Sequence, residues 1–148
     1  MIIYVDTSAA MKLLIEESES SVLADFLEQS RSTVSDTLVA SLLLHTELHC
    51  AANRRSTDIS SEAVAEVLSA IALVDVESGD LTTAPLLPGR LRSADAIHLA
   101  TALRVDARAM VVYDEELQAA ARTAGITVVS PQAEQHALSD AESRDSTG

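Results

Sequence analysis

The sequence predicts an α/β protein in which a parallel β-sheet is covered by helices on both faces. Short aliphatic runs recur along the chain, and longer stretches with helical periodicity separate them. Strands that alternate with helices in this way pack as a parallel sheet between two helical layers. Hydrophobic residues make up 47% of the 148 residues and aromatic residues only 2%, so we expect one aliphatic core.

The predicted strands are short apolar runs between helical or polar segments. They span residues 2–5, 33–35, 73–76, 109–113 and 126–129. The run at 33–35 is the shortest of these. Their brevity and aliphatic character are typical of strands buried in the centre of a parallel sheet.

The predicted helices show apolar residues at three- and four-residue steps. They span residues 8–15, 18–29, 36–53, 61–72, 94–105 and 114–123. Ser93 is a candidate N-cap, Gly125 closes the last helix, and residues 85–89 are expected to form a turn or loop. We expect one domain over residues 1–130, followed by a polar C-terminal tail over 131–148.

Composition excludes several classes of protein. The net charge is −13 and no segment is basic, which disfavours nucleic-acid binding through a broad cationic face. No apolar run approaches the roughly 20 residues of a membrane span, and no basic segment precedes the first strand as in a secretory signal. Cys50 is the only cysteine, so an intramolecular disulfide is excluded. We therefore expect a soluble, cytoplasmic protein without a membrane partner.

Four acidic residues stand where a solvated surface would not require them. Asp6 and Asp114 follow apolar strands, at the carboxyl edge where open parallel sheets bind ligands. Asp95 lies in a small, apolar helix start, and Glu47 lies within an apolar helical stretch, where a lone carboxylate is costly. Carboxylates that cluster repel one another unless a hard cation neutralises them, which favours Mg²⁺ or Mn²⁺ over zinc.

Each acid also has a structural interpretation. Asp6 and Asp114 could cap the helices that follow them, and Asp95 could complement a helix dipole. Glu47 could pair with Arg54, seven residues further along roughly the same helix face. These alternatives stay open at the level of the sequence.

Two histidine patterns also bear on whether the chain binds a metal. His45 and His49 have the spacing of a zinc-binding HExxH helix, but Glu47 lies about 200° around the helix from His45 and faces away. Core or surface histidines are therefore favoured over zinc ligands. His98 lies one turn beyond Asp95 and could orient it, or could be a structural histidine with satisfied hydrogen bonds.

Four segments of this chain, in order and spacing, resemble the PIN-domain ribonucleases. They are Val5-Asp6-Thr7-Ser8-Ala9, Thr46-Glu47-Leu48, Ala94-Asp95-Ala96-Ile97-His98-Leu99-Ala100-Thr101-Ala102 and Tyr113-Asp114-Glu115-Glu116-Leu117. Within that family the chain is most similar to the VapC-type toxins of bacterial toxin–antitoxin pairs. The resemblance covers roughly residues 1–130, and the segment around Asp95 is its most specific part.

The resemblance implies a three-layer α/β/α fold with a central parallel sheet. It implies Mg²⁺-dependent or Mn²⁺-dependent endonucleolytic cleavage of RNA, often tRNA or rRNA, by metal-activated water, with 5′-phosphate and 3′-hydroxyl products. Asp6, Glu47, Asp95 and Asp114 match its catalytic acids in that order. It also implies homodimerisation and a small VapB-like antitoxin that covers the site.

Roles follow for individual residues. Asp6, Asp95 and Asp114 are the expected metal ligands, and Glu47 is expected to hold a water or act as a base. The candidates for phosphate contacts are Arg54, which shares a helix face with Glu47, and Arg90 and Arg92, which flank the loop before Asp95. Val112 stands where the family often has Thr or Ser, two residues before the fourth acid. Two alternatives remain: a catalytically silent regulatory or binding module on this fold, and a metal-dependent phosphoesterase that acts on small substrates.

Overall fold

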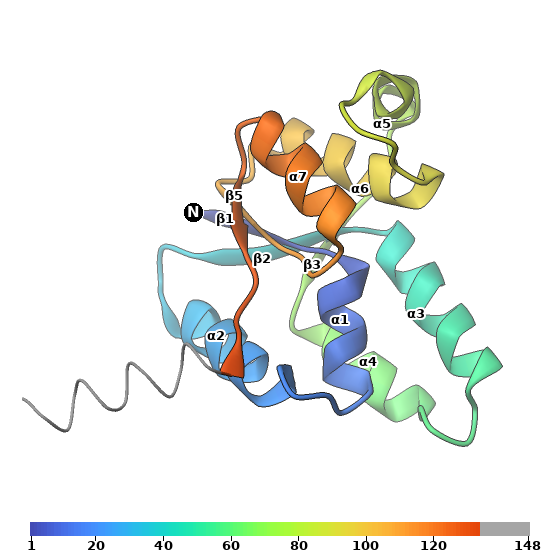
Figure 1. Cartoon of the computed structure of the whole chain (residues 1–148). Helices are drawn as coiled ribbons and strands as arrows, with labels where there is room; N and C mark the ends of the chain where they lie inside the picture. The colour runs from blue at the N-terminus through green and yellow to red at the C-terminus, as the bar shows by residue number, and fades with distance from the viewer. Residues whose placement is uncertain (134–148) are drawn as a thin grey trace, which may run out of the picture.

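The computed structural model describes residues 1–133 and has the predicted architecture, a parallel sheet between two helical layers (Figure 1). Helices α1 to α4 lie on one side of the sheet, and α5, α6 and α7 lie on the other. The strands are β1 (Ile2–Val5), β2 (Thr37–Ser41), β3 (Ala72–Val74), β4 (Ala109–Val111) and β5 (Thr127–Val129). The three-layer α/β/α fold expected from the sequence is confirmed.

The strand order within the described residues is β3-β2-β1-β4-β5, and every neighbouring pair is parallel. The chain builds outward from β1 to β3 and then crosses to β4 on the other side of β1. The direction of winding therefore reverses between β1 and β4, where Val5 is in register with Val111. Ligands of open parallel sheets bind at the carboxyl side of such a switch point.

The helices cover the sheet on both faces and leave its carboxyl edge accessible. They are α1 (Thr7–Leu14), α2 (Ser20–Ser32), α3 (Leu43–Arg54), α4 (Ser61–Ser69), α5 (Ser78–Thr83), α6 (Ser93–Arg104) and α7 (Glu115–Thr123), with a short 3₁₀ turn, η1, at Ala84–Leu86. Gly125, at φ 89°, follows α7 as predicted. Residues 1–133 contain no helix that is long and apolar enough to cross a membrane.

The second strand was predicted wrongly. The sequence placed a strand at 33–35 and one continuous helix over 36–53, whereas Thr37–Ser41 is β2 and the helix begins at Leu43. Residues 38–41 are all buried because β2 lies between β1 and β3 with helices on both faces. A fully buried strand has no alternating polar face, so periodicity does not separate it from a buried helix.

Two further differences concern a helix and a turn that were not predicted and the start of a predicted helix. Helix α5 and the turn η1 were not predicted, because six residues with two threonines and a glycine carry little helical periodicity. Helix α6 begins one residue early, so Ser93 is helical and Arg92 occupies the N-cap position. The predicted polar tail at 131–148 lies, from residue 134 onward, outside the described residues.

An ion pair between buried Asp80 and the partly exposed Arg104 fastens α5 to α6. Asp80 is 1% exposed and accepts hydrogen bonds from Arg104, at 2.8 Å from Nε and 3.1 Å from Nη2. Oδ2 of Asp80 also accepts the backbone N–H of Glu77, which closes a capping box at the start of α5. Burial alone would raise the pKa of Asp80, but the hydrogen bonds from Arg104 outweigh it and lower that pKa.

Candidate active site

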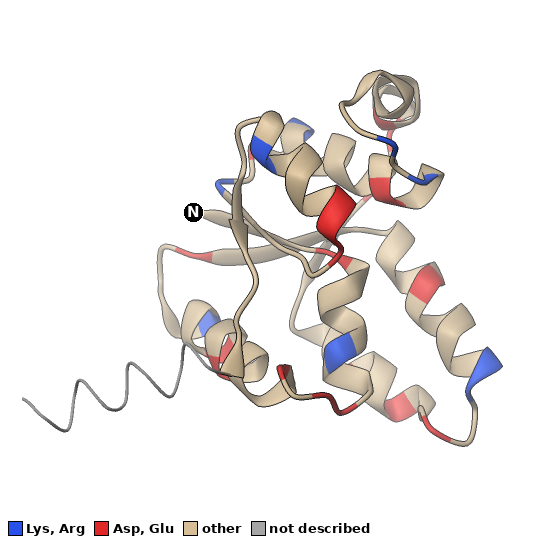
Figure 2. Ribbon diagram, viewed as in Figure 1, with Lys and Arg blue, Asp and Glu red and all other residues tan. Residues whose placement is uncertain are grey.

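The carboxyl edge of the sheet, at the switch point between β1 and β4, carries the predicted acids. Asp6 follows β1 directly, and Asp114 follows β4 after two connecting residues. Glu47 comes from α3 and Asp95 from the first turn of α6, on opposite sides of the sheet. Figure 2 shows acidic segments of α3, α6 and α7 around this one region of the molecule.

Asp6 is 1% exposed, and only one of its two carboxylate oxygens has partners. Oδ2 accepts the backbone N–H of Ser8 at 3.0 Å and the Ser8 hydroxyl at 2.6 Å, so Asp6 is the N-cap of α1. The Ser8 hydroxyl also accepts the N–H of Tyr113, which ties β4 to β1 above the sheet. Among buried side-chain atoms of residues 1–133, Oδ1 of Asp6 is the one without a hydrogen bond. A buried carboxylate oxygen without a donor is costly unless a cation approaches it.

Glu47 is held through one oxygen as well. Its Oε1 accepts the Thr7 hydroxyl at 2.9 Å and lies 2.5 Å from Nε2 of His98. Burial would raise the pKa of Glu47, but the hydrogen bond and charge of His98 outweigh it and hold that pKa below its ordinary value. Glu47 is therefore ionised at neutral pH, and it contacts His98 rather than Arg54.

Asp95 carries the most perturbed carboxyl group of the edge. Burial, the largest cause, and the charges of Asp6 and Asp114 together raise its pKa from the ordinary 3.8 to about 6. A smaller contribution comes from Glu47, while His98 acts in the opposite direction. Burial is thus the largest cause of the shift, and the charges of the other three acids act on Asp95 in addition to it.

Asp114 is exposed and has a structural role in addition to its charge. Its Oδ1 accepts the N–H of Leu117 at 2.8 Å, which makes it the N-cap of α7. Val112 is fully buried and its aliphatic side chain has no hydroxyl, so the position offers none near Asp114. The structure thus bears out the capping interpretation of both Asp6 and Asp114, while it also brings their charges close to Asp95.

The carboxylate oxygens at this edge are ligands that a hard divalent cation prefers, although in the described residues they are not close enough together to surround one. Within residues 1–133, no three His, Cys, Asp or Glu side chains lie close enough together to hold an ion. Mutual repulsion keeps ionised carboxylates apart, and a cation removes that repulsion. The unpartnered oxygen of Asp6 and the nearby carboxylate of Asp95 are both hard oxygen donors of the kind that a divalent cation prefers. The residues therefore fit an all-oxygen Mg²⁺ or Mn²⁺ site.

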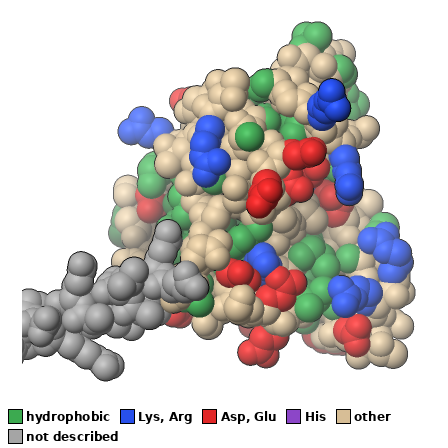
Figure 3. All heavy atoms as spheres, in the orientation of Figure 1, with side chains coloured by type: hydrophobic (Ala, Val, Ile, Leu, Met, Phe, Trp, Pro, Cys, Tyr) green, Lys and Arg blue, Asp and Glu red, His purple; other side chains and the backbone are tan. Residues whose placement is uncertain are grey.

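Basic side chains flank the acids. Figure 3 shows acidic side chains in the middle of one face, with basic side chains beside them. Arg90 and Arg92 lie in the loop before α6, and Arg54 lies at the end of α3. All three are exposed, and within residues 1–133 none of them forms an ion pair. Guanidinium groups in such a setting can contact phosphates on either side of the acids.

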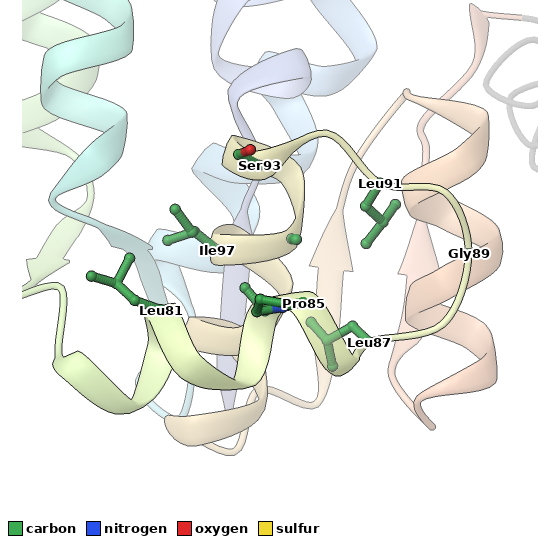
Figure 4. Close-up of a pocket in the computed structure, with 9 residues that line it drawn as sticks. Leu81, Pro85, Leu87, Gly89, Leu91, Ser93 and Ile97 are labelled. Carbon is green, nitrogen blue, oxygen red and sulfur yellow. The ribbon is translucent and has the colours of Figure 1, made fainter.

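An apolar cavity of about 320 Å³ lies behind the start of α6 (Figure 4). Leu81, Pro85, Leu87, Leu91 and Ile97 point into it from α5, η1, the following loop and α6. None of the four acids lines this cavity, so it is separate from the candidate site.

The structure gives different results for the pair His45 and His49 and for His98. The rings of His45 and His49 lie beside each other on α3, with centroids 4.4 Å apart and planes tilted by 54°. Glu47 faces away from His45, as its helical phase predicted, and contacts Thr7 and His98. Of the two roles left open for His98, orientation of Asp95 is not observed: its hydrogen bonds go to Tyr4, Thr7 and Glu47. Only the packing of α6 against β1 and α3 reveals these partners.

Comparisons with known proteins agree with this geometry. The PIN domain family model matches residues 3–123. Ribonuclease VapC46 of Mycobacterium tuberculosis is 36% identical over 131 residues, which cover 87% of this chain and 97% of that protein. A crystal structure of Mycobacterium tuberculosis VapC20, described as a sarcin-ricin loop cleaving toxin, matches with a TM-score of 0.66 at 17% identity, over 87% of this chain and 99% of that chain. VapBC2 from Rickettsia felis, bound to a DNA fragment from its promoter, matches with a TM-score of 0.65 at 14% identity, over 87% of this chain and 98% of that chain.

The solved structures show a shared fold, and the family model together with the more similar relative shows the family. The chain belongs to the PIN-domain family. Within that family it is one of the VapC ribonucleases, which makes it an enzyme of the nuclease class.

Proposed function

We propose that this protein is a metal-dependent endoribonuclease and acts as the toxin of a type II toxin–antitoxin pair. The observation that carries the proposal is the placement of four acids around the carboxyl edge at the switch point, where Oδ1 of Asp6 is buried without a hydrogen-bond donor. The family of the chain sets the reaction class, because its relative VapC46 is named a ribonuclease. The nuclease domain is proposed to span residues 1–130.

Asp6, Asp95 and Asp114 are the proposed ligands of Mg²⁺, with Mn²⁺ as a possible substitute. Asp6 offers Oδ1, the oxygen that the N-cap hydrogen bonds leave unused. When bound, such an ion supplies Lewis acidity that polarises the scissile phosphate and acidifies water. The helix dipole of α6 favours the ionised form of Asp95 in its first turn, against the effect of burial.

The protein's own groups would orient the reaction. Glu47, ionised and clamped through Oε1, accepts a hydrogen bond from the attacking water through its other oxygen and orients that water towards phosphorus. In-line attack with departure of the 3′ oxygen leaves a 5′-phosphate and a 3′-hydroxyl. Arg90 and Arg92 on one side, and Arg54 on the other, would hold the flanking phosphates by bidentate hydrogen bonds.

Partners are proposed from the relatives. The Rickettsia felis structure is a VapBC complex, and a structure from Klebsiella pneumoniae with a TM-score of 0.61 is a toxin–antitoxin complex. A VapB-like antitoxin is therefore the expected partner of this chain, together with a second copy of the chain itself in a homodimer. Structured RNA such as tRNA or rRNA is the proposed substrate, and the cytoplasm is where these molecules meet.

The test is cleavage of a pool of tRNA and rRNA by the purified protein. Reactions contain Mg²⁺, Mg²⁺ with excess EDTA, or the Asp6→Asn variant with Mg²⁺. Asparagine keeps the side-chain oxygen that caps α1, so the variant removes charge without removing the cap. Discrete fragments with 5′-phosphate ends that need both the metal and Asp6 support the proposal. Cleavage that persists in EDTA contradicts it.

A second candidate is a catalytically silent PIN-fold module. Two observations favour it: within residues 1–133 no three potential ligands are gathered into a cage, and Val112 offers no hydroxyl near Asp114. Mn²⁺ binding in calorimetry, together with intact RNA in every reaction, would select this candidate. Hydrolysis of a chromogenic phosphomonoester with intact RNA would instead select a small-molecule phosphoesterase.

A further inference from the structure

A chain of hydrogen bonds runs through the core beneath the candidate site. The backbone N–H of Ser41, at the end of β2, donates to the Tyr4 hydroxyl at 2.9 Å. That hydroxyl lies 2.7 Å from Nδ1 of His98, and Nε2 of His98 lies 2.5 Å from Oε1 of Glu47. Tyr4 and His98 are both 0% exposed, so solvent does not compete for these contacts.

Counting donors and acceptors gives the chain a direction. The Tyr4 oxygen already accepts the N–H of Ser41, and its own hydrogen has one neighbouring acceptor among the described residues, Nδ1 of His98. In the neutral imidazole, Nδ1 must then be the acceptor and Nε2 must carry the hydrogen, and in the imidazolium form Nε2 carries a hydrogen as well. His98 is thereby fixed as a donor towards Glu47, and the Thr7 hydroxyl donates to the same oxygen at 2.9 Å.

Both donors act on Oε1, and within residues 1–133 Oε2 of Glu47 takes part in no hydrogen bond. Asp6 is held in the same way, because its Oδ2 accepts hydrogen bonds from Ser8 while its Oδ1 accepts none. A glutamate held through one oxygen loses most of its rotamer freedom before substrate arrives. The other oxygen is then presented in a fixed direction at no further entropic cost.

We propose that His98, oriented by Tyr4, is a positioning residue that fixes the carboxylate of Glu47 for the cleavage reaction. The inference rests on the proposed ribonuclease function and adds to it a residue outside the four acids. His98 on α6 contacts Glu47 on α3, although the two residues lie 51 positions apart in the sequence. Its contribution is therefore geometric: it connects the central strands β1 and β2 to a side chain on a peripheral helix.

The experiment compares two isosteric replacements of His98. His98→Gln places an amide N–H where Nε2 stands and can still donate to Glu47, whereas His98→Asn reaches only towards Tyr4. Both leave polar atoms in the core, so both are expected to lower the melting temperature similarly. His98→Asn should lower kcat about 10- to 100-fold, the usual effect of losing a group that orients an active-site ligand, with KM changed less than about twofold. His98→Gln should stay within about fivefold of the wild-type kcat.

A matched control separates positioning from simple loss of stability. Leu99 follows His98 on α6 and is also 0% exposed, and it makes none of the hydrogen bonds above. Leu99→Ala removes buried apolar contacts of the same helix, so it should lower the melting temperature while leaving kcat within about twofold when assayed below that temperature. Equal loss of kcat in His98→Gln, His98→Asn and Leu99→Ala, in proportion to stability, overturns the proposal.

A readout that does not depend on activity completes the test. Nitrogen NMR of the metal-free wild type at high pH should show His98 with its hydrogen on Nε2, and Tyr4→Phe should shift its population towards the other tautomer. Observation of the Nδ1–H tautomer in the wild type overturns the proposal. A wild-type protein that fails to cleave RNA while showing the Nε2–H tautomer refutes the ribonuclease function instead, so the two failures are distinguishable.

Discussion

The raised pKa of Asp95 makes the metal-free protein less stable at neutral than at mildly acidic pH. Burial and the neighbouring carboxylates raise that pKa from 3.8 to about 6, so the folded state binds a proton that the unfolded state has already released. Between these two values the unfolded chain becomes progressively favoured as pH rises, and above about 6 the full cost is present. We expect the melting temperature in EDTA to fall between about pH 5 and about pH 7.5.

The magnitude follows from the shift. About two pKa units correspond to about 3 kcal/mol at neutral pH, and at about pH 5 roughly half of that cost has developed. The difference is about 1.5 kcal/mol, or about 5 °C in melting temperature for a chain of this size. Asp95 is partly exposed and solvent screens its charge, which makes these figures upper values.

The assay is a pair of thermal unfolding series, one for the wild type and one for Asp95→Asn, both in EDTA. The control is needed because Glu47 raises the pKa of His98 despite burial, and a histidine with a raised pKa also contributes stability that is lost as pH rises. The difference between the two series isolates Asp95. Asparagine at this position should flatten the pH dependence, and Mg²⁺ should raise the melting temperature of the wild type more than that of the variant. Parallel series for the two proteins would refute the raised pKa of Asp95.

Three further predictions use other parts of the structure. Asp6→Asn should lower cleavage at least about 100-fold with a melting temperature within about 2 °C of the wild type, since the cap is kept; a large drop in melting temperature would make Asp6 chiefly structural. The double variant Arg90→Ala/Arg92→Ala should raise the KM for RNA about tenfold and leave kcat unchanged. It should also make log KM depend less steeply on log salt concentration, because fewer phosphate contacts are formed. An unchanged salt slope would exclude these phosphate contacts. Asp80→Ala should cost about 3 kcal/mol in urea unfolding because Arg104 loses its buried partner, and a loss below about 0.5 kcal/mol would contradict that role.

Local patterns were enough to predict β1, the start of α7 and the placement of Asp6 and Asp114 at strand ends. Each of these features depends on contiguous residues: an apolar run, an acid that caps the next helix, and the carboxyl edge that parallel strands share. The strand Thr37–Ser41 could not be predicted in this way. Its identity depends on two neighbouring strands and two helical layers that bury every side chain from 38 to 41.

The candidate site was likewise predictable from the sequence only in part. The four acids were found from the sequence, because a carboxylate in an apolar frame is costly and stands out against its neighbours. The partners that orient them were not, since Ser8 beside Asp6 and Thr7 beside Glu47 are ordinary residues in a helix start.

Sequence alone therefore determined the fold class, the family resemblance and the identity of the candidate acids. The tertiary structure alone decided that His98 serves Glu47 and not Asp95, that Tyr4 orients it, and that the pKa of Asp95 rises. The physical reason is range. Capping, periodicity and strand-end placement act between residues a few positions apart, whereas desolvation and carboxylate repulsion depend on which segments the fold brings together.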